Sequence, residues 1–285
     1  MQKKAAVDIG SNSIRYLGPN GDRRLITTRL AENIISTHML SDAATERSIA
    51  ALKQLAALAA EQGARPYAYA TSAVRDAMHG SRERFLALAE EIMPVRVLSG
   101  EEEAAFARMG AGIADKPDWG LIDVGGGSCQ LVSEGFAVSA PMGCVRAKDI
   151  CDKKSDGSYA SMREAVFNAC DGLFCFPRIR IPEWVGVGGT ITTLAALSLG
   201  LEIYDASAVG ASLLTRERIE QLAEGLHNAG DEARRRHPLL IKRHDVIVPG
   251  ALVLLYAMRG MGIRALHPSK ADGLDGYYKY ICQNM

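Results

Sequence analysis

Two short stretches each place a carboxylate directly before a loop of small residues. VDIGSNS covers residues 7–13 and IDVGGGS covers residues 122–128, so both follow the pattern [VI]-D-[IV]-G-x-x-S. Glycine lets backbone N–H groups approach an oxyanion without a Cβ in the way, and serine adds a hydroxyl donor. Loops of this composition are suited to binding phosphate against the backbone.

The two loops together predict a site for a phosphate chain and a divalent cation. Carboxylates repel phosphate, so we expect Asp8 and Asp123 to hold a cation, or its waters, beside the phosphate. For one loop alone a tight hairpin turn is an equally good explanation, but two matched loops favour phosphate binding. The residues expected to contact phosphate are Ser11, Asn12, Ser13, Gly125, Gly126, Gly127 and Ser128.

The stretch ATSAVRDA, residues 70–77, contains a basic residue after an expected strand. The guanidinium of Arg75 has a fork geometry that suits phosphate oxygens. A surface ion pair with Asp76 explains the same spacing, and from the residues alone that is the safer interpretation.

Three acidic residues open an expected helix in SGEEEA, residues 99–104. Ser99 and Glu102 have the spacing of a capping box, in which each satisfies a backbone N–H group of the other. Glu101 and Glu103 are not needed for the cap. Either of them can serve as a general base that deprotonates an attacking water, although acids near a helix start are also favoured by the helix dipole.

A third glycine turn, GVGGT, covers residues 186–190. It lacks the GxGxxG spacing, so dinucleotide binding is a weak interpretation. Taken alone, the turn is as well explained by packing of a helix on a strand as by ligand binding. We therefore regard Gly188, Gly189 and Thr190 as weaker candidates for a substrate pocket.

Composition limits the classes of function. The 33 basic and 33 acidic residues balance, so any anion site must be built locally, and specific nucleic-acid binding is not expected. No run approaches the roughly 20 apolar residues of a membrane helix. The six cysteines show no CxxC pair, which favours reduced thiols and a cytoplasmic location; a disulfide between Cys170 and Cys175 has no support from its helical surroundings.

Strands alternate with helices along the chain, which is typical of α/β layers. We expect strands at the start of the chain and near residues 67–71, and helices beginning at Ser41, over residues 81–92 and from Ser99 to about Gly110. The repeated strand and loop then predict two domains, over residues 1–114 and 115–285.

Eight segments, in order, resemble the Ppx/GppA phosphatases, which are exopolyphosphatases and guanosine pentaphosphate phosphohydrolases. They are AAVDIGSNSIR, LSDAATERSIAALKQL, ATSAVRDA, VLSGEEEA, LIDVGGGSCQLV, MGCVR, VGVGGTITTLAAL and DVIVPGALVL. The resemblance implies two ribonuclease H-like domains of the actin-like ATPase (sugar kinase/Hsp70/actin) superfamily, with the active site in the cleft between them. It also implies hydrolysis of a terminal phosphoanhydride, with Glu103 as general base, Arg75 as phosphate ligand and Asp123 as ligand of Mg²⁺.

The sequence departs from the family pattern at three places. The family usually has GGGSTE with a second acidic metal ligand, whereas this chain has GGGSCQ, so Gln130 offers only an amide oxygen to the metal and Gln130→Glu is predicted to lower the magnesium requirement. Leu274 and Asp275 replace charged residues of an Arg-Glu-Gly motif. The chain also ends at residue 285, before the further domains of longer members. These departures predict less processive polyphosphate cleavage.

The leading hypothesis is a hydrolase that releases the terminal phosphate of inorganic polyphosphate or guanosine pentaphosphate. The alternative is a weakly catalytic module that binds these polyphosphates as a sensor, and a kinase of the same superfamily is a weaker third. We expect no membrane partner and leave a homodimer open. Basic residues at 234–237 and 242–244 are interpreted either as an anion-steering rim or, slightly better, as a solvated helix end and loop.

Overall fold

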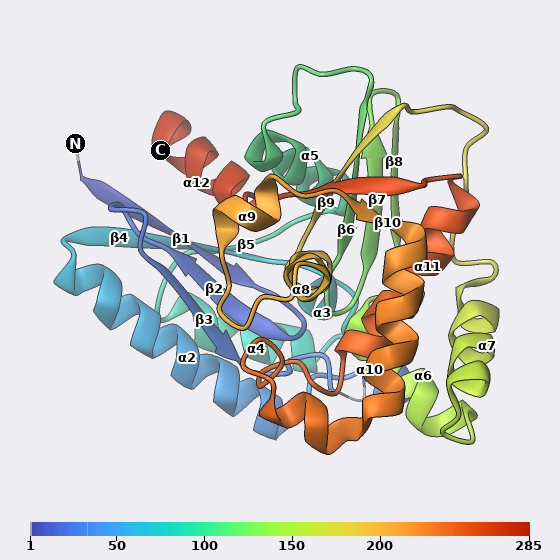
Figure 1. Cartoon of the computed structure of the whole chain (residues 1–285). Coiled ribbons are helices and arrows are strands. Elements are labelled where there is room, and N and C mark those ends of the chain that lie inside the picture. The colour runs from blue at the N-terminus through green and yellow to red at the C-terminus, as the bar shows by residue number, and fades with distance from the viewer. Residues whose placement is uncertain (1, 33) are drawn as a thin grey trace. The chain divides into compact units, whose positions relative to one another are not determined.

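The computed structural model describes residues 2–32 and 34–285 and divides the chain into two compact units (Figure 1). Unit 1 comprises Met1–Gly112 and Ala271–Met285, and unit 2 comprises Ile113–Lys270. Each unit has its own sheet, as expected from the repeat in the sequence.

The sheet of unit 1 has the strand order β3-β2-β1-β4-β5. The first three strands form an antiparallel meander, and β4 and β5 continue the sheet in parallel with β1. Residues 5–9 of β1 are all buried, as is usual for a central strand with both faces covered. The bounds are β1 (Lys3–Ile9), β2 (Ser13–Leu17), β3 (Arg23–Thr27), β4 (Ala64–Ala70) and β5 (Val95–Val97).

Three helices of unit 1, which are α2, α4 and α5, begin where the sequence predicts. Ser41 caps α2 by accepting a hydrogen bond from the Ala44 amide, and Ser99 and Glu102 form the predicted capping box of α5. Figure 1 shows α2 on one side of this sheet and α12 on the other. The bounds are α1 (Ile34–Thr37), α2 (Asp42–Glu61), α3 (Ser72–Arg75), α4 (Ser81–Glu90), α5 (Gly100–Ala111) and α12 (Gly273–Asn284).

The C-terminal helix α12 corrects the predicted domain boundary, because residues 271–285 pack in unit 1 and not with residues 115–270. Helices α12 and α5 cross through two glycines: a Cβ added at Gly276 would lie 1.9 Å from the Phe106 carbonyl oxygen, and one at Gly110 would lie 1.7 Å from the Asp272 carbonyl oxygen. Tyr277 of α12 and Phe106 of α5 pack in the same buried hydrophobic cluster. The amphipathic pattern of a terminal helix does not specify which sheet it covers, so this docking was not visible in the sequence.

The sheet of unit 2 repeats the arrangement of unit 1. Its order is β10-β11-β9-β6-β7-β8, in which β6, β7 and β8 form the antiparallel meander and β9 and β11 run parallel to β6. Strand β10 is an addition. The bounds are β6 (Trp119–Val124), β7 (Cys129–Ser133), β8 (Phe136–Ala140), β9 (Glu183–Val187), β10 (Leu214–Thr215) and β11 (Ala265–Pro268).

The helices of unit 2 include the predicted buried helix α11, whose apolar residues lie in the core. Helix α10 is kinked at Gly230, where φ is 80°. The bounds are α6 (Cys144–Lys154), α7 (Tyr159–Cys170), α8 (Gly189–Ser198), α9 (Ala206–Gly210), α10 (Arg216–Arg236) and α11 (Ile247–Gly260). All six cysteines are free thiols, so the pair Cys170 and Cys175 forms no disulfide. Among the described residues, no helix combines the length and apolar character needed to cross a bilayer.

Candidate active site

The loop of unit 1 between β1 and β2 is a tight turn whose carbonyl groups face its own unit. The Gly10 amide donates to the Ser13 carbonyl oxygen at 3.2 Å, and the carbonyls of Ser11 and Asn12 accept hydrogen bonds from amides of residues 28–31. Within the described residues, the amides of Ser11 and Asn12 have no acceptor. These N–H groups are therefore available to an anion.

The loop of unit 2 between β6 and β7 has the same turn. The Gly125 amide donates to the Ser128 carbonyl oxygen at 3.0 Å, and the first amides of α6 donate to the carbonyls of Gly125 and Gly126 at 2.9 and 2.8 Å. A Cβ at Gly143 would lie 2.5 Å from the Gly125 oxygen, so helix α6 approaches the loop through a glycine. In the described chain the amides of Gly126 and Gly127 have no acceptor, which fits the predicted phosphate loop.

The strand pairing gives each loop aspartate a different neighbour. Asp8 pairs across the strands with Arg15, whose Nε donates to Asp8 Oδ2 at 2.7 Å. Arg15 also forms an ion pair with Asp272, which caps α12. Asp8 Oδ1 is buried and makes no hydrogen bond within the described residues. Asp8 and Asp272 thus share one guanidinium inside unit 1.

Asp123, at the corresponding position of unit 2, pairs across the strands with Gln130. The GVGGT turn packs against Asp123: a Cβ at Gly188 would lie 2.4 Å from Asp123 Oδ1, and Gly188 has a φ of +87° that also favours glycine. The neighbouring Gly189 lies against the guanidinium of Arg243, since a Cβ there would be 2.4 Å from its Nη2. The structure therefore places Gly188 beside the aspartate and Gly189 beside Arg243, with Thr190 buried in the first turn of α8.

The structure brings Arg75 and Glu103 together in unit 1. Arg75 Nη1 donates to Glu103 Oε2 and to the Leu98 carbonyl oxygen, both at 3.1 Å, and Nε contacts Asp76 at 3.3 Å. The ion pair with Asp76 that the sequence suggested exists, but it shares the guanidinium with Glu103. The Glu102 carboxylate accepts a hydrogen bond from the Ser99 amide in the helix cap. Glu103 is therefore the acid of this helix that faces Arg75.

Burial raises the pKa of Glu103 to about 7. Arg75 lowers this pKa by its charge and its hydrogen bond, whereas the negative charges of Asp8 and Asp76 raise it. Only 17% of the Glu103 side chain is exposed, so removal from water is the dominant effect. A carboxylate with this pKa matches the requirement for a general base at neutral pH.

The residues of unit 2 suit a magnesium ion that also binds phosphate and water. They do not suit an ion whose ligands all come from the protein. Mg²⁺ usually keeps several waters and binds through one or two carboxylates together with substrate phosphates. In the described part of the chain no three His, Cys, Asp or Glu side chains gather as a metal-binding group. Asp123 supplies one carboxylate opposite Gln130, next to a loop with unused amides. This donor set suits a metal shared with phosphate and water.

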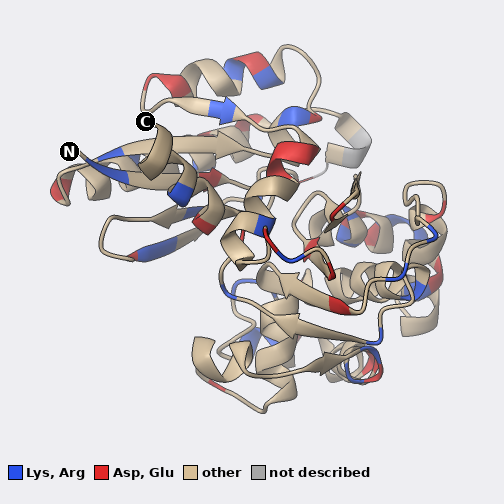
Figure 2. Cartoon of the chain, turned by 90° about the horizontal axis from the view of Figure 1, so that it is seen from above, with Lys and Arg blue, Asp and Glu red and all other residues tan. Residues whose placement is uncertain are grey.

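The basic residues at 234–236 are engaged within the helix end. Arg235 contacts Asp231 at 2.6 Å, Arg236 pairs with Glu232, and Arg234 donates to the carbonyls of Leu226 and His244. These contacts favour the helix-end interpretation over an anion-steering rim. Figure 2 likewise shows acidic and basic residues interspersed along the helices. Arg243 is the member of the second basic stretch that reaches the predicted pocket, where it lies beside Gly189.

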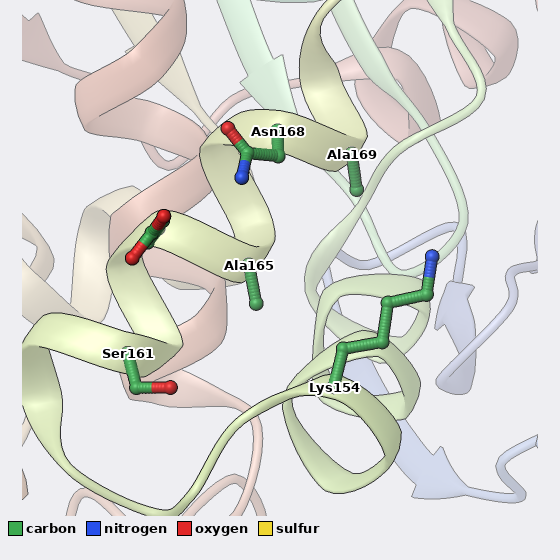
Figure 3. A pocket seen from close by; sticks show the side chains of 6 residues that line it. Lys154, Ser161, Ala165, Asn168 and Ala169 are labelled. Atoms are coloured by element: carbon green, nitrogen blue, oxygen red, sulfur yellow. The ribbon is translucent and has the colours of Figure 1, made fainter.

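A surface hollow of about 440 Å³ lies between α6 and α7 (Figure 3). None of the predicted site residues lines it, and three of its polar residues are exposed to solvent. The lining residues are Lys154, Ser161, Glu164, Ala165, Asn168 and Ala169. The hollow is therefore separate from the loops described above.

Comparison with known proteins agrees with these features. The profile of the Ppx/GppA phosphatase family matches residues 22–273. Exopolyphosphatase 2 of Mycobacterium tuberculosis is 30% identical, with 97% of each chain covered.

Solved structures extend the likeness to the fold. An exopolyphosphatase-like protein has a TM-score of 0.86 at 27% identity, covering 98% of this chain and 99% of that one. The Aquifex aeolicus Ppx/GppA protein has a TM-score of 0.73 at 25% identity, covering 100% and 99%. The predicted α/β fold is thereby confirmed, and it is shared with these Ppx/GppA-type structures over nearly the whole chain. The chain belongs to the Ppx/GppA phosphatase family, and it is a phosphoanhydride hydrolase of the exopolyphosphatase type.

Proposed function

We propose that the chain releases the terminal phosphate of inorganic polyphosphate or guanosine pentaphosphate by attack of water, with Mg²⁺ as cofactor. The observation that carries the proposal is the pair formed by Arg75 and Glu103, because it joins a phosphate-binding guanidinium to a carboxylate with a raised pKa. Two groups of these kinds are what in-line attack of water on a phosphoanhydride requires.

Glu103 is the proposed general base. Its carboxylate accepts a proton from the attacking water as the new P–O bond forms and the bond to the leaving phosphate chain breaks. Arg75 binds the oxygens of the terminal phosphate and holds Glu103 in position through the bond at 3.1 Å. The guanidinium also stabilises the charge of the transition state.

The two glycine loops are the proposed phosphate cradle. The unused amides of Ser11, Asn12, Gly126 and Gly127 donate to phosphate oxygens, and the hydroxyls of Ser13 and Ser128 add to them. When bound, Mg²⁺ would be held by Asp123, with Gln130 as the predicted second ligand, and would neutralise phosphate charge. That both units hold one substrate in a cleft stays a prediction, as do a cytoplasmic location and a homodimer.

The test is phosphate release from long polyphosphate, tripolyphosphate and guanosine pentaphosphate, measured with magnesium and with EDTA. We expect Glu103→Gln to lower the turnover by about a hundred- to ten-thousand-fold, because general-base catalysis contributes that much. Glu101→Gln is the matched control, since Glu101 opens the same helix but is exposed, and it should keep near wild-type turnover.

Three outcomes would redirect the proposal. Wild-type turnover in Glu103→Gln would remove the general-base role. A wild-type protein that binds tripolyphosphate but releases no phosphate at any magnesium concentration would favour the sensor module. Transfer of phosphate from ATP to an acceptor would favour the kinase.

A further inference from the structure

Gln130 and Ser128 form a buried hydrogen bond in the loop of unit 2. Gln130 Nε2 donates to Ser128 Oγ at 2.9 Å. Gln130 is 2% exposed and Ser128 is 3% exposed, so water does not compete for this bond. Gln130 also faces Asp123 across the strands. The amide therefore contacts the serine of the predicted phosphate loop directly.

This bond decides what the serine hydroxyl can do. A hydroxyl has one hydrogen to donate and two lone pairs to accept with. One lone pair of Ser128 receives the Gln130 N–H group, and an NH₂ group offers no lone pair in return. The hydroxyl hydrogen is thus directed away from Gln130. A carboxylate at position 130 would do the reverse, because it only accepts and would take the hydroxyl hydrogen for itself.

We propose that Gln130 is a positioning residue that keeps Ser128 a hydrogen-bond donor to phosphate. This inference rests on the proposed function, since it assumes that the loop of residues 125–128 binds the substrate phosphate. The hydroxyl adds to the unused amides of Gly126 and Gly127 on the same loop. The loop then presents three donors to one anion, and none of the three depends on a metal.

The inference gives Gln130 a role different from that of a second metal ligand. A ligand to magnesium affects binding only when magnesium is present. A residue that orients the Ser128 hydroxyl affects phosphate binding equally in its absence. Binding of a polyphosphate in EDTA therefore separates the two roles, and it does so without measuring turnover.

The experiment is calorimetric titration of tripolyphosphate into the full chain in EDTA. Gln130→Met keeps the side-chain length but removes the donor, and Ser128→Ala removes the hydroxyl. We expect each variant to weaken binding by about five- to tenfold, the effect of one hydrogen bond. The double variant should be no weaker than Ser128→Ala alone, because Gln130 acts only through the hydroxyl.

Control variants keep the test decisive. Gln221→Met carries the same exchange at an exposed position of unit 2 and should bind like wild type. Thermal unfolding of each variant shows whether it is folded. If Gln130→Met does not fold, Gln130→Leu, which also lacks a donor and carries no charge, replaces it in the same cycle with Ser128→Ala.

The possible failures are distinct. Wild-type affinity in Gln130→Met, together with weaker binding in Ser128→Ala, would overturn the positioning role and leave the phosphate loop in place. Additive losses in the double variant would also overturn it. Wild-type affinity in Ser128→Ala, or no binding by the wild type in EDTA, would overturn this inference along with the proposed phosphate loop of unit 2, while Glu103→Gln still tests hydrolysis.

Discussion

The loops of the two units are built alike but differ in the residue that faces the aspartate. In each, an aspartate is the penultimate residue of the first strand, a glycine closes the turn, and the residue seven positions after the aspartate pairs with it across the strands. In unit 1 that residue is Arg15, and in unit 2 it is Gln130. The same turn therefore places a guanidinium opposite the aspartate of unit 1 and an uncharged amide opposite the aspartate of unit 2.

We therefore propose different roles for the aspartates of the two loops. Asp8 shares the guanidinium of Arg15 with Asp272, so a cation at Asp8 would lie beside a positive charge. We therefore expect Asp8 to hold Arg15 and, through it, Asp272 at the start of α12. Asp123 stays the predicted ligand of magnesium, and unit 1 contributes the Arg75 and Glu103 pair.

The largest expected effect separates the two aspartates. Asp123→Asn should lower phosphate release by about a hundred- to a thousandfold, because the contribution of a metal to charge stabilisation is worth several kcal/mol. Asp8→Asn should instead lower the free energy of unfolding by about 1–3 kcal/mol, since it weakens a buried charged hydrogen bond. Rate against magnesium concentration and thermal unfolding should be measured for both variants.

An equal rise in the magnesium requirement of both variants would contradict the proposed difference between the two aspartates. Asp8 would then be a metal ligand, as the sequence suggests, and its buried Oδ1 would be the atom that binds.

The next effect tests whether Arg75 belongs to the site. Arg75→Ala should lower kcat/KM by about thirty- to a hundredfold, as expected for loss of a charge-assisted hydrogen bond to phosphate. Arg75→Lys should recover only part of this, because lysine lacks the bidentate fork. Unchanged steady-state kinetics in both variants would return Arg75 to a surface ion pair with Asp76.

A smaller effect tests the packing of the GVGGT turn on Asp123. Gly188 and Gly200 both have positive φ, +87° and +70°, so alanine strains the backbone at either position, by about 1–2 kcal/mol. Only at Gly188 would the new Cβ meet Asp123, 2.4 Å from Oδ1. We expect Gly188→Ala to lower turnover about tenfold and to lose more thermal stability than Gly200→Ala, which should leave turnover unchanged.

Equal turnover in the two alanine variants would show that the turn does not position Asp123. Loss of activity in Gly200→Ala as well would indicate a general effect of backbone strain in unit 2.

The smallest effect is a shift of the pH profile. Glu103 must be ionised to act as base, so turnover should rise with pH to a midpoint near 7. Asp8→Asn should move this midpoint down by less than about one unit, because the charge of Asp8 raises the pKa of Glu103. An unshifted midpoint in Asp8→Asn would show that the two carboxyls do not interact.

The same raised pKa predicts how stability depends on pH. Glu103 binds its proton more tightly in the folded state than at its ordinary pKa of 4.5, so its contribution to stability declines as pH rises from about 4.5 to 7. Glu103→Gln should remove this decline, which chemical denaturation across that range would detect.

Much of the fold follows from the sequence alone. The repeated strand and loop predicted two related α/β units, and the capping box predicted the start of α5 within one residue. These features are local: they depend on hydrophobic alternation, on glycine in turns and on side chains three residues apart. Arg75, Glu103 and Asp123 were candidates from residue type and from the family resemblance.

Tertiary structure decided the contacts between residues distant in the chain. The ion pair of Arg15 with Asp272, the docking of α12 on α5 through Gly276 and the approach of Gly188 to Asp123 each join separate segments. No local pattern encodes such contacts, because they depend on strand register and helix packing. The sequence by itself indicated which groups are suited to phosphate and metal, and the packing decided which residue each of them meets.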